Sequence, residues 1–289
     1  MKKYYLVTTD HLVEGLWFRD ESDFIAGMNF VAIQAYASKV TVLAFILMSN
    51  HVHFVLSGRW KDVKAFIDGL KSRYSKYLHN KYGTFEFLRR NGVDIQEVSS
   101  LEEGLEKAIA YTQMNSVAAN ICSHPSQYPW GTGPVFFSAS KRPGTRLGDL
   151  SKRARIRLFH CCDVDLPPDW LVGKEGFILP ESYVDITTVE SIYRTPKRMN
   201  YFLVNSSKAK KRIDSSKDNL PAFRDQIILS ALPDLFRSLF QKQRFEELTP
   251  EERTESLRQI RYRFCSNVHQ IARVAGLSYE EAARMLDSV

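Results

Sequence analysis

Two apolar segments separated by a two-residue break are the feature of this sequence that most constrains its fold. Val40 to Met48 is almost wholly apolar and β-prone, the pair Ser49-Asn50 interrupts it, and residues 51–56 resume the apolar pattern. Runs of this length with turn residues between them predict two strands joined by a tight turn. His51 is then the first residue of the second strand.

Segments with helical or strand periodicity surround this hairpin. Apolar spacings of three and four predict helices, and short β-rich runs predict strands. The predicted segments are a strand at Tyr4–Thr9, a helix at Arg19–Lys39, a helix at Asp62–Tyr82, a strand at Gly92–Val98, and a helix from Leu101 to about Ile121 that opens with a Ser100/Glu103 capping box. The order β, α, β, β, α, β, α predicts an α+β fold, an antiparallel sheet of the ferredoxin-like kind covered by helices.

The pattern changes after residue 137. Residues 138–157 are rich in Gly, Pro, Ser, Lys and Arg, which predicts a linker or an arm that contacts phosphate. A helical pattern returns from Pro221 to the last residue and includes Arg258, Arg261 and Arg263. We therefore predict an α+β domain over 1–137, a basic linker and irregular extension over 138–220, and a mostly helical C-terminal region over 221–289.

Composition bounds the class of protein and its partners. The 289 residues are 44% hydrophobic and carry a formal net charge of +7, which favours partners that bear phosphate. No apolar run approaches the roughly 20 residues of a membrane span, and the first residues do not form a signal peptide. The four cysteines lack CxxC spacing, so we expect free thiols and a cytoplasmic protein without a membrane partner.

Two histidines in the second strand of the hairpin are candidate metal ligands. His51 and His53 are two residues apart, and because side chains alternate along a strand, both project from one face. An isolated pair of this kind is more often structural. The helix that carries Tyr111 and Asn115 strengthens the hypothesis, because the i, i+4 spacing places a phenol and a carboxamide on the same helix face.

This set of side chains suits phosphoryl transfer. The reaction needs a nucleophile in line with the scissile bond and a cation to neutralise charge on the phosphate oxygens. Two imidazoles and an amide oxygen leave coordination positions open and suit Mg²⁺ or Mn²⁺. Lys107, one turn before Tyr111, either lowers the pKa of the phenol or is an exposed helix lysine, and the second interpretation is favoured.

Four segments carry a resemblance to a known family. Met48 to Leu56, with its His-hydrophobic-His centre, Lys71 to Tyr77, Tyr111 to Val117 and Tyr128-Pro129-Trp130 resemble, in this order, elements of the single-tyrosine HUH transposases, especially the REP-associated tyrosine transposases. The resemblance covers residues 1 to about 137. Ser49 and Ser116 depart from it, since the family often has proline there.

The resemblance implies both an activity and a site. It implies a metal-dependent endonuclease and strand transferase that acts on single-stranded or hairpin DNA, including REP-like DNA, in DNA transposition and recombination. Tyr111 would be the nucleophile and would form a 5′-phosphotyrosine intermediate, while His51, His53 and Asn115 would hold the cation.

Basic residues would bind the DNA backbone through their charge. The candidates are Lys71, Arg73, Lys76, Arg142, Arg146, Lys152 and Arg153.

Ser278 and Glu281 predict a capping box within a C-terminal helix-turn-helix. This motif either binds duplex DNA or has a purely structural role, and both alternatives stay open. The alternative for the whole chain is a domesticated, non-catalytic DNA-binding protein that uses the HUH fold and the C-terminal helix-turn-helix. In either case we expect a monomer or a homodimer.

Overall fold

The computed structural model describes most of the chain. The described residues are 3–12, 16–83, 88, 91–101, 103–140, 142–160, 164–206, 225–264, 266 and 268–287. Residues 207–224, which carry part of the predicted basic extension, and Cys161, Cys162 and Cys265 lie outside the described residues.

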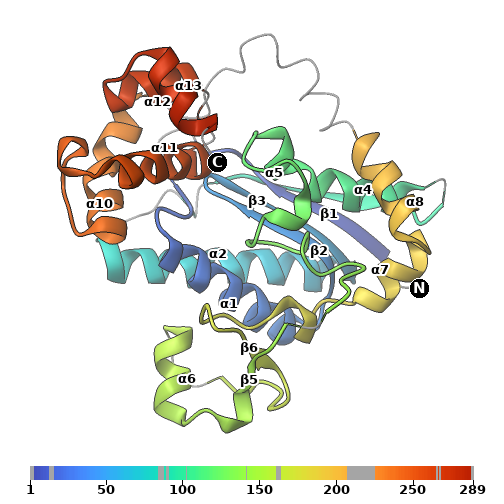
Figure 1. Ribbon diagram of the computed structural model, residues 1–289. Coiled ribbons are helices and arrows are strands. Elements are labelled where there is room, and N and C mark those ends of the chain that lie inside the picture. The colour runs from blue at the N-terminus through green and yellow to red at the C-terminus, as the bar shows by residue number, and fades with distance from the viewer. Residues whose placement is uncertain are drawn as a thin grey trace.

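A four-stranded antiparallel sheet lies at the centre of the α+β fold (Figure 1). The strands are β1 (Lys3–Thr9), β2 (Thr41–Met48), β3 (His51–Gly58) and β4 (Val93–Val98), in the spatial order β2-β3-β1-β4. β2 and β3 pair antiparallel with Met48 opposite His51, so the hairpin predicted around Ser49-Asn50 is confirmed. All four predicted strands are present.

Helices cover the two faces of the sheet differently. α1 (Glu21–Ser38) and α2 (Trp60–Tyr82) lie together on one face, where Phe54 of β3 packs edge-on against Phe66 of α2 at 5.0 Å between ring centroids. α4 (Gly104–Gln113) and α5 (Asn115–Ala118) cross β2 and β3 on the other face. Because side chains alternate along β3, His51 and His53 project toward α4, away from α1 and α2.

The helix expected from Leu101 to about Ile121 is shorter and interrupted. The Ser100/Glu103 capping box is wrong, because Glu103 has a left-handed backbone (φ 63°) and α4 begins only at Gly104. α4 ends at Gln113, where the Asn115 side-chain amide donates to the carbonyls of Tyr111 (2.9 Å) and Thr112 (3.0 Å). A side chain that binds helix carbonyls competes with the backbone, which explains the break.

The described part of 138–206 is folded rather than a linker. Its elements are β5 (Thr145–Arg146), α6 (Lys152–Phe159), β6 (Leu171–Val172), α7 (Ile186–Tyr193) and α8 (Pro196–Val204). The buried Asn29 of α1 donates to the carbonyl of Leu158 and accepts from the amide of Ile178, and the Tyr193 hydroxyl donates to the carbonyl of Glu106. The elements of this segment are short and its sequence is rich in basic residues. Its apolar residues, which attach it to the sheet domain, therefore form no regular pattern that predicts a fold.

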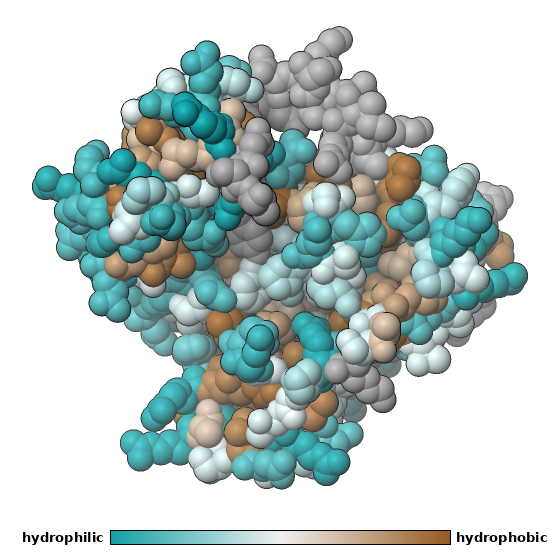
Figure 2. Space-filling view, in the orientation of Figure 1, coloured by the Kyte–Doolittle hydropathy of each residue, from teal (hydrophilic) through white to brown (hydrophobic). Residues whose placement is uncertain are grey.

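The C-terminal helices form a second hydrophobic cluster. They are α10 (Asp225–Phe240), α11 (Pro250–Phe264), α12 (Val268–Ala275) and α13 (Tyr279–Asp287). The predicted capping box is confirmed: the Ser278 amide donates to Glu281 Oε2 at 2.9 Å, and Ser278 Oγ accepts from the Glu281 amide at 3.2 Å. Figure 2 shows hydrophilic residues around the outer edge of this unit.

Short 3₁₀ helices complete the described structure. They are at Pro125–Gln127, Leu147–Asp149, Pro180–Ser182 and Phe245–Glu247. Within the described ranges, none of the helices combines the length and apolar character that a membrane crossing requires.

Candidate active site

Two buried histidines at the start of β3 form the centre of the candidate site. His51 is 4% exposed and His53 is 1% exposed, and both face α4. Their ring centroids are 4.9 Å apart and the rings are perpendicular (89°). The strand alternation expected from the sequence therefore brings the two imidazoles together beneath the helix that carries Tyr111.

A neighbouring polar side chain holds each imidazole at Nδ1. His51 Nδ1 is 2.7 Å from Asn50 Oδ1, so that the ring nitrogen donates to the amide carbonyl. His53 Nδ1 is 3.0 Å from Thr8 Oγ1 of β1. The Asn50 amide oxygen can only accept, so His51 carries its proton on Nδ1 and its lone pair on Nε2. The Thr8 hydroxyl can donate or accept, so it orients the His53 ring without fixing the tautomer. Hydrogen bonds at Nδ1 orient metal-binding histidines. Nε2 is therefore the nitrogen of each ring that would bind a cation.

Tyr111 of α4 lies beside this pair. The ring centroids of Tyr111 and His53 are 5.5 Å apart in an edge-to-face arrangement (88°). The tyrosine is half-buried, and this burial raises the pKa of its hydroxyl above the ordinary value. Lys107 is exposed and lies 3.7 Å from Glu103 as an ion pair, which agrees with the favoured interpretation of an exposed helix lysine.

Asn115 is buried one turn after Tyr111, at the break between α4 and α5. Because its Nδ2 is used by the carbonyls of Tyr111 and Thr112, Oδ1 is the atom that it would offer to a cation. Two imidazole nitrogens and one amide oxygen fit a divalent cation that takes further ligands from water and phosphate. Within the described residues, no group of three or more His, Cys, Asp or Glu side chains is arranged to hold a metal ion, so such a site would depend on this amide.

His11 belongs to the site and was not predicted from the sequence. Its ring stacks on His51 with centroids 3.8 Å apart and planes 15° apart. The amide of the next residue, Leu12, donates to the carbonyl of Asn50, which ties the segment after β1 to the β2–β3 turn. The register of β1 on β3, with Thr8 opposite His53, is the signal that would have found it.

The predicted DNA-binding residues do not surround the histidines. Lys71 is buried and its Nζ donates to the carbonyl of Asn91, so the prediction that it binds DNA is wrong. Arg142 forms a two-point ion pair with Glu181, with both hydrogen bonds at 2.7 Å. An arginine in such an ion pair stabilises the fold of the extension rather than binding a DNA phosphate.

The other predicted cations lie on different parts of the surface. Arg146 of β5 and Arg153 of α6 are exposed, and Lys152 also projects from α6, which packs on the α1 side of the sheet. Arg73 and Lys76 are on α2, across the sheet from Tyr111. The structure thus brings His51, His53 and Tyr111 together, has Asn115 one turn after Tyr111, and places these cations elsewhere.

Other arginines lie closer to the tyrosine helix. A cavity of about 280 Å³ is lined by Asn120 and Ile121, which follow α5, and by Arg258 and Arg261 of α11. Arg263, the third member of this arginine run, is 2% exposed and donates to the carbonyl of Arg19. Of these three arginines, Arg258 and Arg261 therefore line the cavity, whereas Arg263 joins α11 to the segment before α1.

No protein-family model, no curated protein and no solved structure matches the chain. What the site does is therefore inferred from its own side chains.

Proposed function

We propose that this protein is a metal-dependent, single-tyrosine DNA endonuclease and strand transferase of the HUH type that acts on single-stranded or hairpin DNA. The observation that carries the proposal is the contact between Tyr111 and His53, at 5.5 Å between ring centroids, beside the perpendicular ring of His51. A phenol at the edge of a paired-imidazole site is the arrangement that cleavage through a phosphotyrosine requires.

The topology supports the same proposal. The strand order β2-β3-β1-β4, with α1 and α2 on one face, is compatible with the ferredoxin-like sheet that the family resemblance implies. In this arrangement β3 is a central strand, so the histidine pair sits on a rigid element. α4 then presents the nucleophile from the opposite face to α1 and α2.

In the proposed reaction Tyr111 Oη attacks a DNA phosphorus atom. A bond forms between Oη and phosphorus, and the bond from phosphorus to the 3′-oxygen breaks. The phenol loses its proton, and the leaving 3′-oxygen gains one to become a free hydroxyl. A phenol of pKa about 10 serves as nucleophile and as leaving group, so a 3′-hydroxyl can reverse the step and join strands. A bound Mg²⁺ or Mn²⁺ would neutralise charge on the phosphate oxygens.

The protein's own groups have separate roles in this scheme. Thr8 and Asn50 orient the imidazoles, which with Asn115 would hold the cation. Burial raises the pKa of the Tyr111 hydroxyl, so burial by itself does not activate the nucleophile. Arg258 and Arg261 line a cavity beside the end of the tyrosine helix, where they would contact the DNA backbone.

A covalent trapping experiment tests the proposal. Purified protein is incubated with Mn²⁺ and a pool of labelled hairpin oligonucleotides, and denaturing electrophoresis is used to detect a protein-bound label. We expect an adduct with wild type and none with Tyr111→Phe, because the variant lacks only the nucleophilic oxygen. Tyr201→Phe is the matched control, since Tyr201 is 62% exposed on α8.

The control separates chemistry from folding. Tyr201→Phe is expected to form the adduct at the wild-type level. An adduct of equal yield with Tyr111→Phe would mean that another side chain is the nucleophile. No adduct from wild type with any hairpin or either metal would instead favour a DNA-binding protein without catalysis.

A further inference from the structure

Two adjoining cavities lie between α2 and α6, remote from the histidine pair. One has a volume of about 780 Å³ and the other about 480 Å³, and both include Val164 and Asp165 in their walls. We call these two cavities together the α2–α6 groove. Its polar and charged lining comes from α1 and α2 and from the extension that begins with α6: Gln34, Ser72, Arg73, Lys76, Asn80, Lys152, Arg155, His160 and Asp165.

The charge of the groove is strongly positive. Arg73 and Lys76 line the larger cavity, Lys152 and Arg155 line the smaller one, and Asp165 is the one acid among the described lining residues. Burial lowers the pKa of His160, with the charge of Lys81 acting in the same direction, so His160 is neutral at physiological pH. Four cations therefore stand against one carboxylate.

The cations are presented in two ways. Lys76 and Lys152 are exposed and form no ion pair with any residue in the described ranges. Arg73 is half-buried, and its Nε donates to Gln34 Oε1 of α1 at 3.3 Å. The buried rings of Phe30 and Tyr77 form part of the wall beside them. The groove thus combines two exposed ammonium groups with a half-buried guanidinium held by Gln34.

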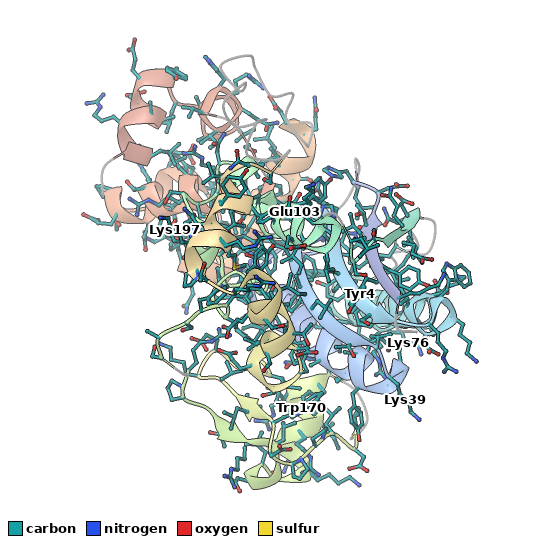
Figure 3. The ribbon with its side chains drawn as sticks, turned by 90° about the vertical axis from the view of Figure 1, so that its right-hand side faces the viewer. Tyr4, Lys39, Lys76, Glu103, Trp170 and Lys197 are labelled. Atoms are coloured by element: carbon teal, nitrogen blue, oxygen red, sulfur yellow. The ribbon has the colours of Figure 1, made fainter. Side chains whose placement is uncertain are left out.

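The groove and the candidate active site lie on different sides of the sheet. Lys76 is on α2, which packs on the face of β3 opposite to the face that carries the histidines and Tyr111. Figure 3 shows Lys76 on one side of the strands and Lys197 of α8 on the other. Phosphate bound in the groove would therefore not be the phosphate that Tyr111 attacks.

We infer that the α2–α6 groove binds the phosphate backbone of a single-stranded stretch of DNA, separately from the His51 and His53 site. The cations occur on both sides of the shared Val164–Asp165 wall, which fits an extended polyanion better than a single phosphate. The backbone would be recognised through charge, without base-specific contacts. Binding in the groove does not require that Tyr111 be a nucleophile.

Charge reversal at the groove tests the inference. Fluorescence anisotropy is measured with labelled oligodeoxythymidylate of about 12 nucleotides, a length within the usual span of single-stranded sites, in the presence of EDTA. The groove variant is Lys76→Glu with Lys152→Glu. The matched control is Lys61→Glu with Lys197→Glu, which changes the net charge equally at exposed lysines that do not line the groove.

The two variants are expected to differ clearly. The groove variant should bind about tenfold or more weakly than the control, and the slope of its salt dependence should fall by about 0.7 for each phosphate that the variant no longer neutralises. Equal affinities of the groove variant and the control would overturn the inference. Adenosine monophosphate that competes as well as the oligonucleotide at equal phosphate concentration would also overturn it, because the groove would then take a small anion.

The outcome is distinguishable from that of the trapping experiment. The binding measurement contains EDTA and detects no covalent bond, whereas the adduct requires Mn²⁺ and the Tyr111 hydroxyl. Loss of binding in the groove variant, together with no adduct from wild type, would leave the groove assigned and the proposed catalysis wrong. Normal binding by the groove variant, together with a Tyr111-dependent adduct, would support the proposed catalysis and show that the groove assignment is wrong.

Discussion

At the scale of single residues, the candidate site depends on two polar side chains that do not themselves meet a substrate. Thr8 reaches His53 from the neighbouring strand, and Asn50 reaches His51 from the turn. A hydrogen bond at Nδ1 fixes the orientation of the imidazole ring and leaves Nε2 as the nitrogen that would bind a cation. We therefore assign Thr8 and Asn50 as positioning residues.

Replacing Thr8 tests this assignment. Thr8→Val keeps the shape of the side chain but removes the hydroxyl, and we expect Mn²⁺ affinity to fall about 10-fold to 100-fold, the usual effect of losing such a partner. Thr8→Ser retains the hydroxyl and should restore most of the affinity. Calorimetric titration with Mn²⁺ gives the affinities. Equal affinities of the valine and serine variants would show that the hydroxyl does not orient His53.

At the scale of elements, the amide side chain of Gln34 is one of the groups that join α1 to α2. Gln34 of α1 donates to Ser38 Oγ (2.9 Å) and to the carbonyl of Ala65 in α2 (3.3 Å), and it accepts from Arg73. The two helices approach closely at Gly69, where a Cβ atom would come within 2.3 Å of Gln34 Nε2. Glycine is unfavourable within a helix, so its presence here reflects this packing.

Because the two helices approach closely at Gly69, we expect alanine at this position to destabilise the protein. On an open helix face, Gly→Ala stabilises by up to about 1 kcal/mol, whereas Gly69→Ala should lower the free energy of unfolding by about 1–3 kcal/mol because Gln34 must move. Adding Gln34→Ala should recover part of this loss. Urea unfolding of both single variants and the double variant measures the coupling. Additive effects would contradict the proposed contact.

At the scale of the whole molecule, two hydrophobic clusters meet near the histidines. Leu16, from the segment between β1 and α1, is buried in the cluster of the C-terminal helices, whereas Leu12 of the same segment is buried in the cluster around the sheet. Arg263 of α11 donates to the carbonyl of Arg19, which reinforces the join. The segment that carries His11 is thus attached to both clusters.

Removing the Leu16 side chain should separate the two clusters during unfolding. Leu16→Ala should lower the stability of the C-terminal cluster by about 2–5 kcal/mol. The chain's four tryptophans precede residue 171, so their fluorescence follows the sheet cluster, while far-ultraviolet circular dichroism follows all helices. We expect the two urea transitions to coincide in wild type and to separate in Leu16→Ala. Separation in Leu12→Ala as well would show that the effect is not specific to the C-terminal cluster.

The sequence by itself determined the features that depend on neighbouring residues. Alternation along a strand placed His51 and His53 on one face, and the two-residue break placed the turn at Ser49-Asn50. Helical periodicity located α1 and α2 to within about two residues of their observed ends, and the Ser278/Glu281 capping box was predicted correctly. These features follow from local backbone geometry, which short-range patterns encode directly.

Only the tertiary structure decided which distant segments meet. It buried Lys71 against Asn91, stacked His11 on His51, and brought Lys76 and Lys152 to one groove. Charge and periodicity show that a residue is polar or that it lies on one helix face, but not which other segment covers that face. That choice depends on how apolar surfaces far apart in the chain pack together, and packing is a property of the assembled fold rather than of any short stretch.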